Sequence, residues 1–270
     1  MNILYCGDDH MKRGLLLSIL SLLDQVPATL NIYVLTAKVT PQTVPLAPTT
    51  IAYLNDLVQQ RRSTNQVQLI DITDLVQQTP PTANFQTIFT PSCMLRLYAD
   101  QVTALPDKLL YLDTDVLCRQ DCRDFYDQSL AGADLAGILD HYGQWLFHQH
   151  GWHRDYLNSG ILLLNLKRIR QTGLFTKCRQ CCQTKQMFMP DQSALNKLAQ
   201  HKVIWPRRYN EQRRLHADTV FQHFTTSFRM LPWVHILTVK PWEVEAMHHK
   251  LKLHAYDQLL AEYQALALKL

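Results

Sequence analysis

Two carboxylates separated by one residue end an apolar run near the middle of the chain. Asp113-Thr114-Asp115 follows the apolar residues 109–112. Side chains at i and i+2 of an extended segment share a face, so both acids point the same way. Two like charges at the mouth of a buried sheet are costly unless a cation lies between them, and oxygen ligands suit Mg²⁺ or Mn²⁺. The spacing alone leaves two interpretations open: a metal site, or two solvated acids at a strand end.

Cysteine pairs offer a second set of candidate metal ligands. Cys118/Cys122 and Cys178/Cys181 could supply four thiolates for zinc. The gap between the pairs is far longer than in compact zinc ribbons, and no Gly-rich knuckle surrounds them. We therefore expect buried or surface thiols instead. An odd number of cysteines and no recognisable secretory signal predict reduced thiols and a cytoplasmic location.

Composition limits the classes of partner. The 270 residues are 47% hydrophobic and 19% charged, which is typical of a soluble globular protein with a full core. A net charge of +4 does not indicate nucleic-acid binding, and no apolar stretch is long enough to span a membrane. The C-terminal third is locally basic at Arg207-Arg208, at Arg213-Arg214 and from His248 onward. This favours an anionic substrate or a membrane surface.

The elements that position the acids follow an α/β order. Residues 2–6 read as a buried strand, 14–23 as an apolar helix and 30–35 as a second strand, which is the opening of a βαβ unit. Further strands are expected at 67–72, 109–112, 134–139, 161–164 and 201–205, and helices at 49–61, 92–102 and 250–270. A nucleotide can bind outside the carboxyl end of the first strand, although the Gly-rich dinucleotide fingerprint is absent.

One segment mixes aromatic side chains with histidines. Residues 141–156 contain two tryptophans and four histidines. The mixture suits a lid or an acceptor-binding surface, and an ordinary loop with buried aromatics fits equally well. From Asp218 onward the pattern becomes irregular.

Several polar landmarks occur in a fixed order along the chain. They are the turn at Asp8, Arg96, Asp113-Thr114-Asp115, Asp140, Asn158-Ser159-Gly160, Asp191-Gln192, and a histidine before Lys240-Pro241-Trp242. Over roughly residues 2–242 this series resembles glycosyltransferase family 8, which includes bacterial lipopolysaccharide galactosyl- and glucosyltransferases and glycogenin. The resemblance implies a GT-A fold: a Rossmann-like, mostly parallel mixed sheet flanked by helices, with a less regular C-terminal part. We expect the domain to cover residues 1–245, with 246–270 as its helical extension.

The same resemblance implies an activity. A family 8 enzyme transfers a hexose from UDP-glucose or UDP-galactose to a glycan, glycolipid or glycoprotein acceptor, retains the anomeric configuration and uses Mn²⁺, with Mg²⁺ as the alternative ion. Peripheral contact with the inner face of a membrane and a homo-oligomer are compatible with this expectation.

Residue roles at the metal and nucleotide follow from the resemblance. Asp113 and Asp115 would hold the metal ion, with His235 as the third ligand and His223 as its competitor. Three further side chains would bind the nucleotide part of the donor: Asp8 at the uracil or ribose, Thr114 between the two acids, and Lys240 at the diphosphate.

Roles at the donor sugar are implied in the same way. Arg96, Asp140 and Asn158 would hold the sugar. Asp191 would bind its hydroxyls, and Gln192 would lie beside the anomeric carbon. An amide is a poor nucleophile, so we expect retention through front-face attack rather than a covalent intermediate.

Two other functions remain open at this point. Asp113-Thr114-Asp115 also resembles the nucleophile strand of haloacid-dehalogenase-like phosphatases, although that motif usually ends the first strand. A catalytically weak sugar-nucleotide-binding protein would carry the same landmarks.

Overall fold

A computed structural model describes residues 1–86, 90–141, 155–229 and 235–270, with the backbone alone for 227–229 and 235–237. Its centre is a seven-stranded mixed sheet with the order β3-β2-β1-β4-β7-β6-β8. The strands are β1 (Asn2–Cys6), β2 (Asn31–Thr36), β3 (Gln66–Asp71), β4 (Lys108–Leu112), β6 (Leu135–Leu139), β7 (Leu157–Asn165) and β8 (Lys202–Trp205). The strand that carries the two acids therefore lies in the middle of the sheet.

Strand direction brings several polar turns to one edge of the sheet. β1 is parallel to β2 and β4, and β2 is parallel to β3. β7 is antiparallel to β4 and β6, and β6 is parallel to β8. The carboxyl ends of β1, β4, β6 and β8 thus meet the beginning of β7. Ligands of open α/β sheets bind at this edge.

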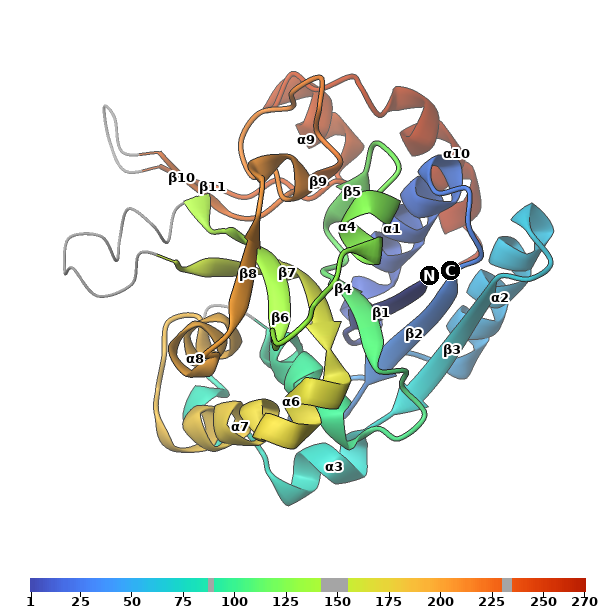
Figure 1. The fold of residues 1–270 in the computed structure, drawn as a ribbon. Helices are drawn as coiled ribbons and strands as arrows, with labels where there is room; N and C mark the ends of the chain where they lie inside the picture. The colour runs from blue at the N-terminus through green and yellow to red at the C-terminus, as the bar shows by residue number, and fades with distance from the viewer. Residues whose placement is uncertain (87–89, 142–154, 230–234) are drawn as a thin grey trace.

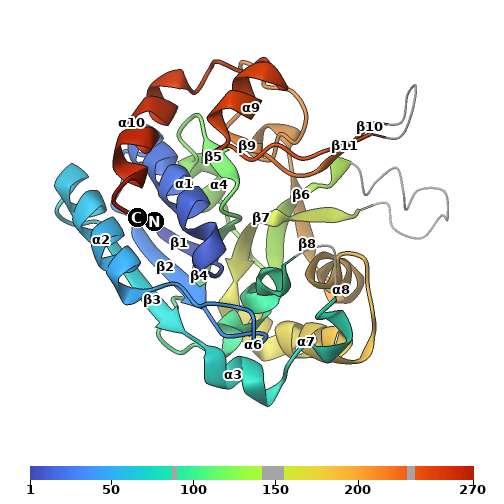
Figure 2. The same ribbon diagram turned by 180° about the vertical axis from the view of Figure 1, so that it is seen from behind.

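Alternating side chains give the sheet two buried faces. Ile3 and Tyr5 of β1 belong to one apolar cluster, and Leu4 and Cys6 belong to the other. The first face is covered by α1 (Lys12–Gln25), α2 (Pro48–Arg61) and α10 (Asp257–Ala267). The second is covered by α3 (Thr73–Gln78), the 3₁₀ helix η3 (Pro91–Gln101), α6 (Leu166–Thr172), α7 (Leu174–Thr184) and α8 (Pro190–Leu198). Figures 1 and 2 both show the two chain ends side by side near α2 and α10.

Short elements complete the described part of the chain. β5 (Val116–Cys118) pairs with β9 (Phe221–His223), and β10 (Ser227–Arg229) pairs with β11 (His235–Leu237), both antiparallel. The remaining helices are η1 (Asp9–Met11), η2 (Thr82–Asn84), α4 (Arg123–Asp127), η4 (Arg207–Tyr209) and α9 (Val244–His249).

Gly14 explains how closely α1 packs against the turn that follows β4. A Cβ atom at this position would lie 2.5 Å from Trp242 Cζ3 and 2.8 Å from the carbonyl oxygen of Thr114. Only glycine permits this approach. The first turns of α1 are therefore set directly against the Asp113–Asp115 turn.

Three expectations need correction. The helix predicted at 92–102 is a 3₁₀ helix over residues 91–101. The helix predicted at 250–270 begins at Asp257, and the irregular region after Asp218 contains three short strands.

The zinc alternative is wrong for these cysteines. Cys118 and Cys122 belong to the apolar cluster on the α1 face of the sheet, and Cys178 belongs to the cluster on the opposite face. The pairs therefore cannot share one ion, and all seven cysteines are free thiols.

Within the described ranges, none of the helices has both the length and the apolar character that a membrane crossing requires.

Candidate active site

Backbone hydrogen bonds hold the turn after β4 between two other strands. The amide of Asp113 donates to the carbonyl oxygen of Gly160 in β7 at 2.8 Å, and the amide of Phe224 donates to the carbonyl oxygen of Asp115 at 3.0 Å. In the small sheet, Val116 of β5 lies opposite His223 of β9. Ligand atoms of Asp113, Asp115 and His223 consequently lie within 4.8 Å of one another.

His223 faces both carboxylates. Its side chain is 4% exposed, and its Nε2 lies 3.3 Å from Asp115 Oδ1 and 3.8 Å from Asp113 Oδ2. Burial by itself would lower the pKa of His223, but the charge of Asp115, its hydrogen bond to the imidazole and the charge of Asp113 together outweigh it and raise that pKa above the ordinary value for histidine. The two carboxylates thus favour a positive charge at this position.

The geometry favours His223 over His235 as the third ligand. His235 lies in β11, opposite Arg229 of β10, and its side chain is outside the described residues. His223 is the histidine that the described structure brings to the two acids. The resemblance alone had ranked these two histidines in the reverse order.

Gly160 leaves space between the three side chains. A Cβ atom on this residue would lie 2.3 Å from His223 Cε1 and 2.7 Å from Asp113 Oδ2. Any other residue would therefore fill the region into which the ligand atoms point. Two carboxylates and one imidazole around such a space fit Mn²⁺ or Mg²⁺. His223 Nδ1 has no hydrogen-bond partner among the described residues, so the ring is free to adopt the tautomer in which Nε2 binds a metal.

Lys240 adds a positive charge on the other side of Asp115. Its Nζ lies 2.5 Å from Asp115 Oδ2 and 3.3 Å from the carbonyl oxygen of Phe224. Burial alone would raise the pKa of Asp115, but Lys240 and His223 outweigh it and hold that pKa below its usual range. Asp115 is therefore a carboxylate at neutral pH.

Arg96 is buried under the turn at Asp113–Asp115. It is 3% exposed, and its Nη2 donates to Asp113 Oδ1 at 2.9 Å. Its Nε lies 3.3 Å from Asp191 Oδ2, and its Nη1 donates to the carbonyl oxygen of Ser159. Tyr111 lies under the guanidinium at 4.1 Å and donates a hydrogen bond of 2.5 Å to Asp113 Oδ1. Arg96 thus joins η3, β4, β7 and α8 at one point and orients Asp113.

A buried polar network connects the ends of β6, β7 and α8. Asn158 Nδ2 donates to Asp140 Oδ2 at 2.7 Å, and Gln192 Nε2 donates to the same oxygen at 3.2 Å. The amide of Ser159 donates to Gln192 Oε1 at 2.9 Å. All four residues are more than nine-tenths buried. The network fixes both ends of the Gln192 amide group.

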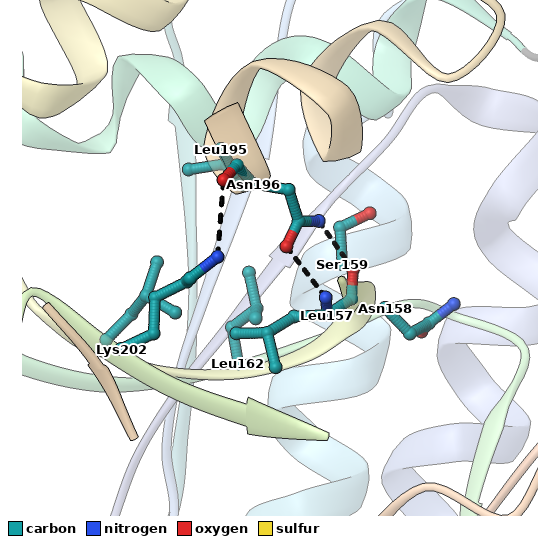
Figure 3. A pocket seen from close by; sticks show the side chains of 8 residues that line it. Leu157, Asn158, Ser159, Leu162, Leu195, Asn196 and Lys202 are labelled. Atoms are coloured by element: carbon teal, nitrogen blue, oxygen red, sulfur yellow. Dashed lines mark hydrogen bonds between the residues drawn. The ribbon is translucent and has the colours of Figure 1, made fainter. Parts of the chain in front are cut away.

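Asn196 fastens α8 to β7 one turn beyond Gln192. Its Oδ1 accepts from the amide of Leu157, and its Nδ2 donates to the carbonyl oxygen of Leu157, both at 2.7 Å. Figure 3 shows these two bonds, with Lys202 donating to the carbonyl oxygen of Asn196 at the other side. The side chain acts as a clamp that sets the height of α8 above the sheet.

Asp8 and Thr114 are placed at the same edge. Asp8 is 4% exposed; its carboxylate accepts from Ser92 Oγ at 2.6 Å and from the amide of His10 at 3.1 Å. The Thr114 hydroxyl contacts Met11 Sδ at 3.4 Å. The donor-site residues predicted after β1 and β4 therefore share one edge of the sheet with the candidate metal ligands.

Sequence reasoning did not single out Ser92, Tyr111 or Gly160 as contributors to the site. Ser92 and Tyr111 carry no signal in one sequence, because their contacts with the site are visible only in the folded structure. Gly160 was visible only as part of Asn158-Ser159-Gly160. The predicted lid or acceptor segment at 141–156 lies largely outside the described residues, which omit 142–154.

Comparisons with known proteins agree with this arrangement. The family model for glycosyl transferase family 8 matches residues 2–246. A lipopolysaccharide 1,2-glucosyltransferase from Escherichia coli (strain K12) is 30% identical over 150 residues, which are 51% of this chain and 42% of that protein. A second protein of that name from Escherichia coli is 25% identical over 248 residues, covering 77% of this chain and 71% of the relative. The first match thus spans less than half the length of its relative.

Solved structures give the same fold. The crystal structure of galactosyltransferase LgtC in complex with donor and acceptor sugar analogues superimposes with a TM-score of 0.68 at 19% identity, covering 97% of this chain and 96% of that one. The glycosyltransferase GlyE of Streptococcus pneumoniae superimposes with a TM-score of 0.64 at 19% identity, covering 98% of this chain and 64% of that one. The predicted GT-A fold is confirmed.

Proposed function

Since the chain belongs to glycosyl transferase family 8 and is thereby a hexosyltransferase, we propose that it transfers a hexose from a UDP-sugar to a glycan or glycolipid with retention of the anomeric configuration. UDP-glucose and UDP-galactose are the proposed donors, and Mn²⁺ or Mg²⁺ is the proposed cofactor. The acceptor is a glycan because the matched curated relatives are named as lipopolysaccharide glucosyltransferases.

One observation carries the proposal. Asp113, Asp115 and His223 converge around a space that Gly160 keeps open, with Lys240 beside them. The diphosphate of a UDP-sugar carries two negative charges. A metal ion together with the ammonium group of Lys240 would neutralise them. When bound, the metal ion acts as a Lewis acid on the UDP leaving group.

Lys240 has a second role in this scheme. In the structure its ammonium group neutralises Asp115. With a metal ion at Asp115, the ammonium would be available to donate to an oxygen of the donor diphosphate and to stabilise charge that develops on it during bond cleavage. We assign Asp8, which follows β1, to the uracil or ribose.

The donor sugar is assigned to the network of Asp140, Asn158 and Gln192. Both atoms of the Gln192 amide group are engaged: Nε2 donates to Asp140, and Oε1 accepts from the Ser159 amide. Asp191 is paired with Arg96. Engaged groups of this kind position a sugar rather than attack it. The arrangement therefore supports front-face attack, in which the acceptor hydroxyl loses its proton to the departing phosphate.

The two rival functions fit less well. A haloacid-dehalogenase-like phosphatase is disfavoured by the family match and by the place of the acids after β4 instead of the first strand. A catalytically weak binding protein is disfavoured by the complete set of ligands around Gly160.

Calorimetric titration with UDP-glucose, UDP-galactose and UDP-GlcNAc, with Mn²⁺ and with EDTA, tests the proposal. We expect binding of at least one UDP-hexose that weakens at least tenfold in EDTA, and UDP release that Asp115→Asn abolishes. Asp124→Asn, at an exposed acid on α4, is the matched control. UDP-sugar binding that is equal in Mn²⁺ and EDTA, or an Asp115→Asn enzyme that turns over at the parent rate, would refute the metal-dependent mechanism.

A further inference from the structure

A cavity lies at the same edge of the sheet, beside the network of Asp140, Asn158 and Gln192. Its volume is about 590 Å³, and it is formed where β6 and β8 end, by His141, Trp205, Arg207 and residues 210–214. Asn210 joins the two regions, because its Nδ2 donates to Asn158 Oδ1 at 2.9 Å. The amide of His141, the residue after Asp140, donates to Gln212 Oε1 at 3.2 Å. A molecule in this cavity would therefore lie beside the network assigned to the donor sugar.

The floor of the cavity contains unsatisfied polar atoms. Asn210 is 1% exposed and Gln212 is 7% exposed. Asn210 Oδ1 and Gln212 Nε2 have no hydrogen-bond partner among the described residues. A buried polar atom without a partner costs about 1–3 kcal/mol. One acceptor and one donor from residues that line the same cavity match the hydroxyl groups of a sugar, each of which can donate and accept.

The rim of the cavity carries excess positive charge. Glu211 is 2% exposed, and its carboxylate is fully engaged by the Arg207 guanidinium and by the backbone amides of Arg213 and Arg214, the latter two at 3.0 and 3.3 Å. Arg213 and Arg214 are exposed, and their guanidinium groups form no ion pair within the described part of the chain. Two uncompensated guanidinium groups favour an oxyanion, which they can bind in a bidentate manner.

The pKa of His141, which lines the cavity, is affected by the same positive charge. Burial lowers the pKa of His141, and the charge of Arg213 lowers it further. The arginine charge is thus felt at the cavity wall and is not confined to bulk solvent.

We propose that this cavity is the acceptor site and that the acceptor is an anionic sugar, with its hydroxyls on Asn210 and Gln212 and its phosphate or carboxylate on Arg213 and Arg214. The assignment rests on the proposed transferase function and narrows its acceptor class. It also explains the arginine pair Arg213-Arg214 that stands out in the sequence.

Ligand-observed NMR in the absence of donor tests the proposal on the full chain. The probes are glucose, glucose 6-phosphate, glucuronate and inorganic phosphate. We expect each anionic sugar to bind at least tenfold more tightly than glucose, and the double variant Arg213→Ala/Arg214→Ala to remove that preference. The stronger of the two anionic sugars distinguishes a phosphorylated from a carboxylated acceptor.

Two further variants separate the parts of the site. Gln212→Ala should weaken glucose 6-phosphate while leaving inorganic phosphate unchanged. Arg62→Ala removes an exposed arginine at the end of α2 and should change nothing. Equal affinity for glucose and glucose 6-phosphate, or an equal loss in Arg62→Ala, would overturn the proposal. UDP-hexose binding with Mn²⁺ must persist in the double arginine variant. If the parent protein itself does not bind a UDP-hexose, the transferase function is refuted instead of the acceptor site.

Discussion

At the scale of single residues, the site depends on how charges compensate one another. Asp115 has a carboxylate between an imidazole and an ammonium group. Removing a single partner from such a buried group leaves an uncompensated charge, which is strongly destabilising. A metal ion held by Asp113, Asp115 and His223 would supply positive charge to the two carboxylates, and Lys240 would then be available to a donor diphosphate.

The third ligand can be identified by substitution. We expect His223→Ala to lower Mn²⁺ affinity by at least tenfold, because it removes one of three ligands. His235→Ala should change the affinity by less than about twofold. Isothermal titration with Mn²⁺ on both variants decides between them, and the reverse order of effects would restore His235 as the ligand.

Metal binding should depend on pH with a defined sign. Mn²⁺ binds neutral imidazole and therefore competes with the proton on His223. Because the folded protein raises the pKa of His223, the proton is retained to a higher pH than on a free histidine. Apparent Mn²⁺ affinity should fall as pH falls through that raised pKa. Titrations between about pH 5.5 and 8 measure this, and a flat profile contradicts the assignment.

At the scale of elements, the site depends on close approach between strands. β7 passes the turn after β4 so closely that Gly160 cannot carry a side chain. We expect Gly160→Ala to lower Mn²⁺ affinity and UDP-sugar turnover at least tenfold while the fold is retained. Gly132→Ala is the control, since its φ of 75° strains the backbone while a Cβ there meets nothing within 4 Å. Unchanged Mn²⁺ affinity in Gly160→Ala would show that β7 can shift to accommodate the Cβ atom, and would contradict this prediction.

The clamp between α8 and β7 gives a second prediction at this scale. Asn196→Ala leaves two backbone groups of Leu157 without partners, so we expect a loss of about 2–4 kcal/mol in the free energy of unfolding. Because Gln192 lies one turn away, kcat should fall as well. Urea denaturation and steady-state kinetics measure the two effects; a loss of stability at constant kcat would mean that the clamp does not position Gln192.

Element order was predictable from the sequence, whereas element contacts were only partly so. The apolar runs at 2–6 and 109–112 predict buried strands, and both form. The antiparallel direction of β7 has no signal in its residues, because a fully buried strand reads the same either way. Its direction nevertheless decides that Gly160, and not Leu164, lies beside Asp113. The sequence also gives no signal that His223 lies nearer to the two acids than His235, because β9 has only three residues, too few for a recognisable strand pattern.

At the scale of the whole molecule, the C-terminal helix belongs to the core. Leu260 of α10 is 1% exposed and packs in the same cluster as α1. We expect Leu260→Ala to cost about 2–5 kcal/mol of unfolding free energy. Leu268→Ala, at a side chain 90% exposed, should cost less than about 0.5 kcal/mol. Thermal and urea unfolding provide the comparison, and equal small losses would mean that α10 is dispensable. The boundary at residue 245, membrane contact and oligomerisation stay predictions.

The sequence positions of the metal ligands have a consequence for how the enzyme matures. β4 needs β1 on one side and β7 on the other, and His223 comes from β9, near the end of the chain. Most of the chain must therefore be synthesised before His223 can pack against Asp113 and Asp115. Partly made chains hold the two acids without the histidine. We therefore expect the full ligand set proposed for the metal ion to form only late in folding.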